Sequence, residues 1–381
     1  MAVFRESVPR DLPGKMMEIN WSLVLLLALL GGIGIGMLFS VGGGSWEPWA
    51  GKHAIRFALG ITGMLVIAMF PPRFWMGMSY PIYAFALILL IGVEFAGVTI
   101  NGSQRWIDLG PIRLQPSEIM KVAVVFALAR FYHDLPTEKV SGLGGLIMPA
   151  IIIGMPAALI ATQPDLGTTL LLVATGGCVI FLAGLSWRVI VPGIVASMIG
   201  LGWLFTYGLQ DYQRARVMTV LNPELDPLGA GYQIIQSKIA LGSGGFTGKG
   251  FIEGTQSQLN YLPEKQTDFI FTILGEEFGF VGGIAVLAIY ALVLANTVII
   301  ATSCKSTYLR LLSMGIGATF ALYVFINVGM VTGLLPVVGV PLPMISYGGT
   351  VMLSVLAGFG LILGAHIHRN ATPPSGTGFL G

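Results

Sequence analysis

Charged residues and cysteines are scarce in this chain. Only 10% of its 381 residues are Asp, Glu, Lys or Arg, whereas 55% are hydrophobic and the mean hydropathy is +0.82. A soluble globular protein carries about 25% charged residues. The two cysteines, Cys178 and Cys304, predict neither a disulfide nor a metal site. The scattered basic residues form no tract typical of nucleic-acid binding. The composition therefore excludes a soluble domain and indicates a polytopic membrane protein.

Apolar runs long enough to cross a hydrocarbon core of about 30 Å recur along the chain. They predict an all-α polytopic membrane protein with ten transmembrane helices, at 21–41, 54–70, 76–98, 117–132, 145–162, 168–184, 188–207, 269–302, 309–332 and 345–366. The range 117–132 is short and charged at its start. The range 269–302 is too long for one span unless its first turns lie at the interface. No cleavage signal stands out after the first run, so we expect it to be retained.

The distribution of Lys and Arg predicts the orientation. They are about twice as frequent on the side of the two termini as in the short loops of the other side. We therefore expect a cytoplasmic N-terminal segment 1–20, a single transmembrane domain 21–366, and a cytoplasmic tail 367–381 that is disordered. One long extracytoplasmic loop, 208–267, joins helices 7 and 8. Both termini are predicted to be cytoplasmic, on the face opposite this loop.

The first charged cluster lies at 101–121, NGSQRWIDLGPIRLQPSEIMK. Glu118 and Lys121 are three residues apart at a helix start, so their side chains share one face. They form either a self-neutralising ion pair or a functional pair. Arg105 and Trp106 precede them on the outer face, where a cation could hold a lipid-linked phosphate. Asp165 lies between two helices, where a carboxylate either caps a helix or contributes to a site.

The second cluster follows the long loop. The glycine-rich run around Lys249 is no phosphate-binding P-loop, because Ser243 stands where the first glycine is needed. The segment 232–241 is amphipathic, so it either lies on the membrane surface or packs the loop down. Glu264, Lys265 and Asp268 come at the membrane edge, where an ionisable residue is costly and is a functional candidate.

Two of these outer residues keep two interpretations. Asp268 is either a catalytic carboxylate or the start of a helix. Ser346 is either structural or part of the lining of a cavity. The sequence predicts no metal-ligating set.

Four ordered motifs resemble the SEDS family of membrane proteins, and together they extend over most of the chain. They are QPSEIMK at 115–121, QPDLGT at 163–168, GKGFIEGTQSQLNYLPEKQTDFIF at 248–271 and GVPLPMISYGGT at 339–350. The GTQSQL stretch before LPE favours the elongation branch, which maintains rod shape, over the division branch.

The resemblance implies a peptidoglycan glycosyltransferase in the bacterial cytoplasmic (inner) membrane. It would polymerise lipid II at the outer face for cell elongation. Its partners would be a class B penicillin-binding protein transpeptidase, other rod-complex membrane proteins and membrane lipid. By the same resemblance Asp268 is the essential carboxylate, Glu118 and Lys121 are a functional pair, and Arg105 with Trp106 match an outer-loop motif. Gln266 stands where the family commonly has His, and a Gln side chain cannot act as a titrating base.

Forming a β-linkage from an α-diphosphate donor inverts the anomeric carbon and requires a base, for which Asp268 is the candidate. Lys121 and Arg105 would stabilise the leaving diphosphate, supported by Lys249, Lys265 or a divalent cation. No cofactor is otherwise implied. The alternatives are a lipid II flippase or a non-catalytic scaffold for a transpeptidase. The gathering of unusual charges on the outer face favours the enzyme, because a flippase needs a polar route between both leaflets.

Overall fold

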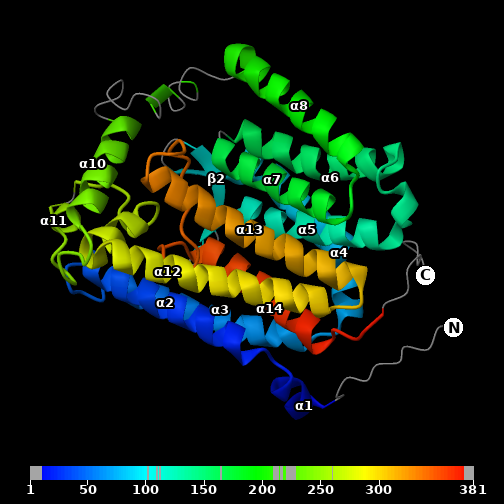
Figure 1. Cartoon of the computed structure of the whole chain (residues 1–381), viewed down its shortest axis with the longest axis horizontal. Helices are drawn as coiled ribbons and strands as arrows, with labels where there is room; N and C mark the ends of the chain where they lie inside the picture. The colour runs from blue at the N-terminus through cyan, green and yellow to red at the C-terminus, as the bar shows by residue number, and fades with distance from the viewer. Residues whose placement is uncertain are drawn as a thin grey trace.

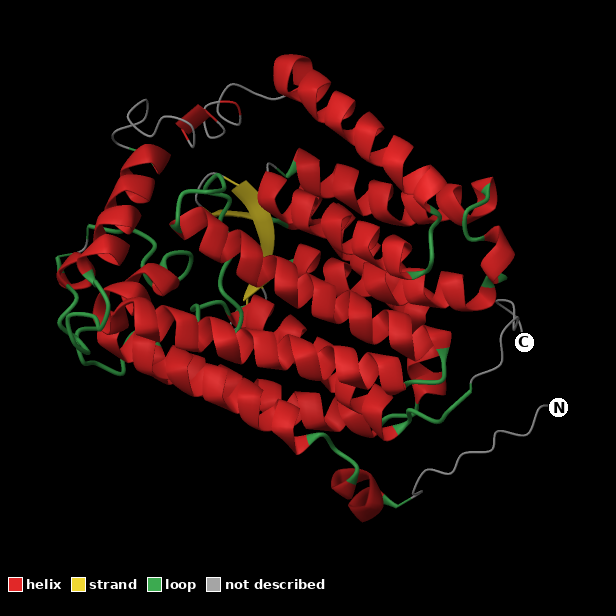
Figure 2. Ribbon diagram, in the orientation of Figure 1, coloured by secondary structure: helices red, strands yellow, loops and turns green. Residues whose placement is uncertain are grey.

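The computed structural model describes residues 11–100, 103–108, 110, 113–163, 165–208, 214, 218–219, 229–259 and 261–372. Long helices that run roughly parallel or antiparallel form one bundle, and a small sheet and two shorter helices lie towards one end (Figures 1 and 2). Parts of the predicted loop 208–267, at 209–213, 215–217, 220–228 and 260, lie outside the described residues. So do residues 1–10 and most of the tail predicted to be disordered, 373–381.

A helix lies over each predicted membrane range. These helices are α2 (Trp21–Val41), α3 (Ala50–Met69), α4 (Pro72–Ala96), α5 (Pro116–Asp134), α6 (Leu143–Thr162), α7 (Leu166–Leu182), α8 (Trp187–Trp203), α12 (Ile270–Ser303), α13 (Thr307–Val331) and α14 (Gly349–Ile367). Within the described residues, seven helices are long and apolar enough to cross a membrane: α2, α3, α4, α6, α12, α13 and α14. The all-α, multi-pass architecture is confirmed, and the number of ten spans stays a prediction.

The shorter elements connect these helices. They are α1 (Leu12–Met17), β1 (Val98–Ile100), β2 (Ser103–Asp108), β3 (Arg113–Leu114), η1 (Thr137–Lys139), η2 (Leu204–Gly208), α10 (Ala230–Ser243) and α11 (Thr255–Gln258). The three strands form an antiparallel sheet in the order β1, β2, β3, directly before α5. This sheet places β2, with Arg105 and Trp106, beside the start of α5.

The centre of the bundle is formed by α5, α13 and α14, whose side chains are buried on most faces. By contrast α8 lies at the edge of the bundle (Figure 1), and Val195, Met198 and Ile199 are exposed along it. Exposed apolar side chains on a membrane helix suit contact with lipid. The site-bearing helices are therefore the inner ones.

The start of α2 and the ends of α3 and α14 meet on one side. Arg369 Nη1 lies 2.9 Å from Glu18 Oε2, and Lys15 Nζ donates to the Met69 carbonyl at 3.0 Å. These contacts agree with the prediction that both termini share a side. The compartment on that side stays a prediction.

Helix α14 begins at Gly349, later than the predicted residue 345. Residues 339–348 are non-helical, and this stretch contains Pro341, Pro343 and Met344, which has a positive φ of 67°. Proline removes a backbone donor, and a positive φ is incompatible with a right-handed helix. The stretch instead forms a compact turn against the segment before α12.

Helix α12 is broken at Gly279, where φ is 66° and ψ is −163°. The glycine-rich turn after α10 occupies the break. There the Lys249 and Gly250 amides donate to the carbonyls of Glu276 and Glu277 at 3.0 Å, and the Phe280 amide donates to the Gly245 carbonyl at 3.0 Å. These bonds satisfy backbone groups that a broken helix leaves without partners. The break accounts for the excess length of the predicted range 269–302, and it gives the glycine run a structural role.

Helix α10 packs against α12. Its Ser237 hydroxyl is buried and lies 2.7 Å from both the Thr272 hydroxyl and the Val331 carbonyl. Of the two interpretations of residues 232–241, the structure supports a helix that packs the loop onto the bundle.

Candidate functional site

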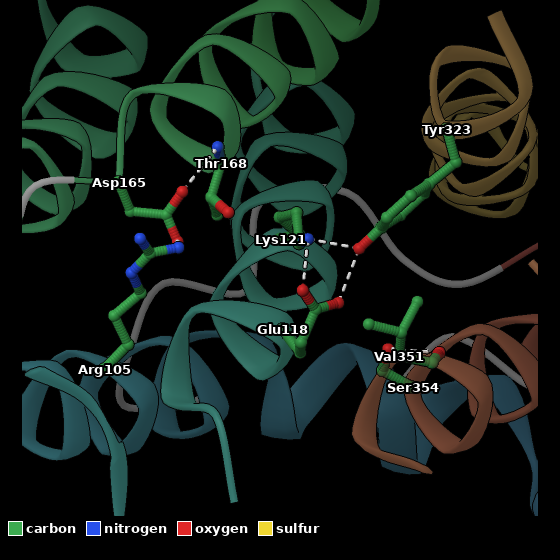
Figure 3. Close-up of polar contacts among 8 residues, drawn as sticks. All are labelled: Arg105, Glu118, Lys121, Asp165, Thr168, Tyr323, Val351 and Ser354. Atoms are coloured by element: carbon green, nitrogen blue, oxygen red, sulfur yellow. Dashed lines mark hydrogen bonds and ion pairs between the residues drawn. The ribbon is translucent and has the colours of Figure 1, made fainter. Parts of the chain in front are cut away.

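Glu118, Lys121 and Tyr323 form a closed triangle inside the bundle (Figure 3). Lys121 Nζ donates to Glu118 Oε1 at 2.6 Å and also to the Tyr323 hydroxyl, which in turn donates to Glu118 Oε2 at 2.5 Å. The ammonium also lies 4.5 Å from the centre of the Tyr323 ring. Pro116 at the first helical position and Glu118 in the first turn suit the start of α5. The predicted i, i+3 pair is present, with a third member on α13.

The triangle borders a cavity between α5, α13 and α14. Only 3% of the Lys121 side chain and 4% of the Glu118 side chain are exposed. An ion pair at this depth is costly to desolvate unless its members satisfy one another. The cavity is lined by Glu118, Lys121, Val122, Val125, Ile316, Thr319, Phe320, Tyr323, Ser354 and Val355. The buried ion pair therefore borders a cavity lined mostly by apolar side chains of these three helices.

Arg105 and Asp165 form a second ion pair on the other side of α5 (Figure 3). Arg105 Nη1 lies 3.2 Å from Asp165 Oδ2, while Asp165 Oδ1 accepts from the Thr168 amide at 3.1 Å. Asp165 thus caps α7 and binds the arginine at once, so both interpretations of this carboxylate fit one geometry. Trp106 is the next residue on β2, and consecutive strand residues point to opposite faces. Only Arg105 of this motif therefore faces Asp165.

Asp268 lies in the turn that leads into α12. Burial of its carboxyl, and next the negative charge of Glu264, raise the pKa of Asp268 to about 7, against the opposing effect of the Arg105 charge. A carboxylate with a pKa near the working pH is suited to proton transfer. Arg105 thus lies within electrostatic reach of two carboxylates, Asp165 and Asp268.

The neighbours of Asp268 hold the same turn together. Glu264 Oε2 accepts from the Thr267 hydroxyl at 3.0 Å and from Gln266 Nε2 at 3.4 Å. Lys265 is only 7% exposed, and burial lowers the pKa of its ammonium. Ser346 donates to the Thr267 carbonyl at 2.5 Å, which supports the structural interpretation of that residue.

Lys249 has a partner that the sequence did not predict. Its ammonium donates to Glu276 Oε1 at 2.7 Å and to the Thr255 hydroxyl at 2.8 Å. Glu276 is fully buried in the first part of α12. This ion pair joins the glycine-rich turn to α12, which is a structural role for Lys249. To bind substrate, the Lys249 ammonium would have to give up or share its bond to Glu276.

Sequence reasoning missed Tyr323 and Asn327, both on α13. Each is a polar residue flanked by apolar neighbours in α13, and each bonds to segments far away in the sequence. Asn327 Nδ2 donates to the Asp268 carbonyl at 2.9 Å and to the Val340 carbonyl at 2.7 Å. A polar residue at membrane depth was the available signal, but it did not point to these partners.

The fold and the site define a multi-pass membrane protein that gathers charged residues at one end of a helical bundle. The profile of the FtsW, RodA and SpoVE proteins, described as "Cell cycle protein", matches residues 20–371. The chain belongs to this family, the SEDS proteins. The family predicted from the four motifs is confirmed.

Individual relatives agree with this assignment. The chain is 48% identical over 319 residues to "Peptidoglycan glycosyltransferase MrdB" of Escherichia coli strain K12, which covers 82% of this chain and 84% of the relative. The fold of the present chain matches a solved chain from work titled "Structural coordination of polymerization and crosslinking by a peptidoglycan synthase complex". The TM-score is 0.80 and the identity 33%, and the match covers 92% of this chain and 98% of the solved chain. It also matches Thermus thermophilus rod shape determining protein RodA, with a TM-score of 0.69, 28% identity and coverage of 92% and 97%. These relatives support the elongation branch.

Proposed function

We propose that this protein is a peptidoglycan glycosyltransferase that polymerises lipid II into β-1,4-linked glycan strands for cell elongation. The supporting observation is that the positive charge of Arg105, on β2, acts on the carboxyl group of Asp268, in the turn before α12, and lowers its pKa. A candidate base and a candidate cation thus come together from distant segments. The names of the relatives support the same reaction class.

The mechanism follows from the charges of the site. The Asp268 carboxylate takes the proton of the acceptor sugar 4-hydroxyl as its oxygen bonds to the anomeric carbon of the donor. The bond from that carbon to the diphosphate breaks on the opposite face, which inverts the carbon. Lys121 and Arg105 stabilise the negative charge on the undecaprenyl diphosphate that leaves. Glu118 and Tyr323 orient the Lys121 ammonium through their hydrogen bonds.

A dedicated protein site for a divalent cation does not fit the residues present. Among the described residues, no three His, Cys, Asp or Glu side chains come together in a way that could hold a metal ion. Mg²⁺ commonly binds through one or two carboxylates and substrate phosphates, so a divalent cation would enter with the diphosphate. The mechanism above uses no step through a metal.

The setting of the reaction is part of the proposal. We place the charged end of the bundle at the outer face of the bacterial inner membrane and both termini in the cytoplasm. The partner is a class B penicillin-binding protein transpeptidase within the rod complex. The solved relative from a peptidoglycan synthase complex supports this pairing.

The test is polymerisation of labelled lipid II by the purified chain with its transpeptidase partner, with transpeptidation inhibited. Wild type is compared with Asp268→Asn and with Asp108→Asn, a matched change at an outer-face carboxylate that pairs with Arg113 at 3.6 Å. We expect long glycan strands from wild type and Asp108→Asn and none from Asp268→Asn. Lys121→Arg keeps the charge but changes its shape, and we expect a marked loss.

Other outcomes would redirect the assignment. A folded wild-type complex that makes no polymer would favour a lipid II flippase or a scaffold for the transpeptidase. Equal polymer from wild type and Asp268→Asn would keep the enzyme but move the base to another carboxylate, with Glu118 and Asp165 next in line.

A further inference from the structure

The backbone of the turn that carries Asp268 is held at three consecutive carbonyls. The Tyr347 amide donates to the Gln266 carbonyl at 2.8 Å, the Ser346 hydroxyl to Thr267 at 2.5 Å, and Asn327 Nδ2 to Asp268 at 2.9 Å. Two of these donors come from the turn before α14, and the third comes from α13.

Asn327 is the most informative of the three donors. It is fully buried, and its amide nitrogen donates both to Asp268 and, at 2.7 Å, to the carbonyl of Val340. Only the NH₂ group of an amide can donate twice, so two carbonyl partners fix the orientation of this side chain. The two donated bonds satisfy the buried NH₂ group, whereas the buried Oδ1 of Asn327 has no hydrogen-bond partner among the described residues. Asn327 therefore joins the Asp268 turn to the 339–348 stretch from inside the bundle.

The carboxyl group of Asp268 lies against that same stretch. A Cβ atom added to Gly339 would stand 3.5 Å from Asp268 Oδ2, and Gly339 adopts a positive φ of 69°. The amide of Asn327 binds the carbonyl of Val340, the next residue. One side chain thus fixes both the backbone of Asp268 and the wall beside its carboxyl.

Asn327 and Tyr323 are four residues apart, so they lie on one face of α13, one turn from each other. Tyr323 holds Glu118 and Lys121, and Asn327 holds Asp268. Resting on the function proposed above, we infer that Asn327 is a positioning residue for Asp268, and that this face of α13 sets the spacing between the base and the Lys121 cation. Such a spacing matters because displacing a reacting group by about 1 Å can cost about 100-fold in rate.

The inference separates the rate of the chemical step from substrate binding. Asn327→Ala removes both donated hydrogen bonds and frees the Asp268 turn to shift. We expect kcat to fall about 10-fold to 100-fold, with KM for lipid II changed less than about threefold, because the substrate-facing cations are untouched. A carboxyl that moves towards water also regains its ordinary acidity, so the acidic limb of the pH profile should move to lower pH. Glu264 and Arg105, whose charges act on Asp268, are unchanged in the variant.

The experiment measures kcat, KM and the pH profile of lipid II polymerisation by the full chain with its transpeptidase partner. The variants are Asn327→Ala, Asn327→Leu, which keeps a similar shape, removes both donors and adds no charge, and Ser346→Ala, which removes the hydrogen bond to the Thr267 carbonyl. The matched control is Ser237→Ala, which deletes a buried hydroxyl bonded to Thr272 and Val331, each four residues beyond Asp268 and Asn327, but which bonds none of the three carbonyls of the Asp268 turn. Thermal unfolding and binding of the partner are recorded for every variant.

The inference is supported if both Asn327 variants lose kcat and shift the acidic limb while Ser237→Ala keeps the wild-type profile. Ser346→Ala should lose less in the same direction, and it carries the test if the Asn327 variants do not fold. Wild-type kcat and profile in a folded Asn327→Ala, or in Ser346→Ala when it alone folds, would overturn the inference and leave the proposed reaction intact. An equal loss at all pH values in Asn327→Ala and Ser237→Ala would also overturn it. If wild type makes no polymer, or Asp268→Asn remains active, the proposed function or its base fails, and the inference fails with it.

Discussion

Lys249 and Glu276 form an ion pair of 2.7 Å that joins the glycine-rich turn to the first part of α12. The carboxylate is fully buried, whereas 27% of the lysine side chain is exposed. The break at Gly279 follows three residues later, and the same turn fills it. The pair and the break therefore belong to one structural unit at the start of α12.

Removing the lysine should destabilise this unit. In Lys249→Met the buried Glu276 loses its cation, and we expect a loss of about 2 kcal/mol, less than for a fully buried pair because Lys249 is partly exposed. Thermal unfolding in detergent measures it. The double variant Lys249→Met with Glu276→Gln removes the buried charge and should recover part of the loss. A double variant no more stable than the single one would contradict this account.

Gly279→Ala should be worse tolerated than an ordinary glycine substitution. Its φ of 66° disfavours any side chain, and the new Cβ would stand 2.4 Å from the Gly248 backbone nitrogen. We expect a loss of at least about 2 kcal/mol, seen as low yield and a lower unfolding temperature. Gly63→Ala is the control, since no atom lies within 4 Å of its added Cβ and alanine favours a helix. Similar behaviour of the two variants would show that the break is not needed.

Tyr323→Phe tests the triangle around Lys121. The change keeps the ring beside the ammonium but deletes the hydroxyl that bonds Glu118 and Lys121. A buried charged pair that loses one partner is less well oriented, so we expect about a tenfold fall in polymerisation rate. Tyr308→Phe, on the same helix, removes a buried hydroxyl that bonds Ser79 at 3.0 Å. That control should keep wild-type activity, and an equal fall in both would point to a general packing effect.

The pH profile should report the carboxyl of Asp268. With a pKa of about 7, this group is neutral in acid and cannot accept a proton there. The rate should therefore fall about tenfold per pH unit well below pH 7, and it should reach its plateau above that value. The Arg105 charge lowers this pKa, so Arg105→Gln should move the limb to higher pH. Arg113→Gln, on the neighbouring strand, should not move it. A profile flat between pH 5.5 and 8 would exclude this carboxyl as the base.

Much of the fold follows from the sequence because membrane helices are specified by length and apolarity. The ends were less predictable. The start of α14 depends on Met344 and its neighbouring prolines, and the break in α12 depends on a backbone approach by Gly248. Neither effect appears in a local apolar pattern, although the length of the range 269–302 already required an explanation.

The residues of the candidate site likewise fall into those that the sequence predicts and those that it does not. Glu118 with Lys121 and the helix cap at Asp165 are local patterns, so the sequence predicts them. The bonds of Tyr323 and Asn327 reach segments distant in the chain, and a polar residue flanked by apolar neighbours does not identify its partner. The structure thus adds the contacts between segments that are distant in the sequence, and most of these contacts are made by residues of α13.

The Glu18 to Arg369 contact connects the start of α2 to the end of α14. The two ends of the helical bundle's chain therefore lie next to each other in space. A circular permutant that links these two residues and opens between α5 and α6 would lose α1 and its Lys15 to Met69 hydrogen bond but keep the packing of the long helices on one another. In such a chain the order of membrane insertion changes while the finished architecture does not, which separates the route of assembly from the stability of the product.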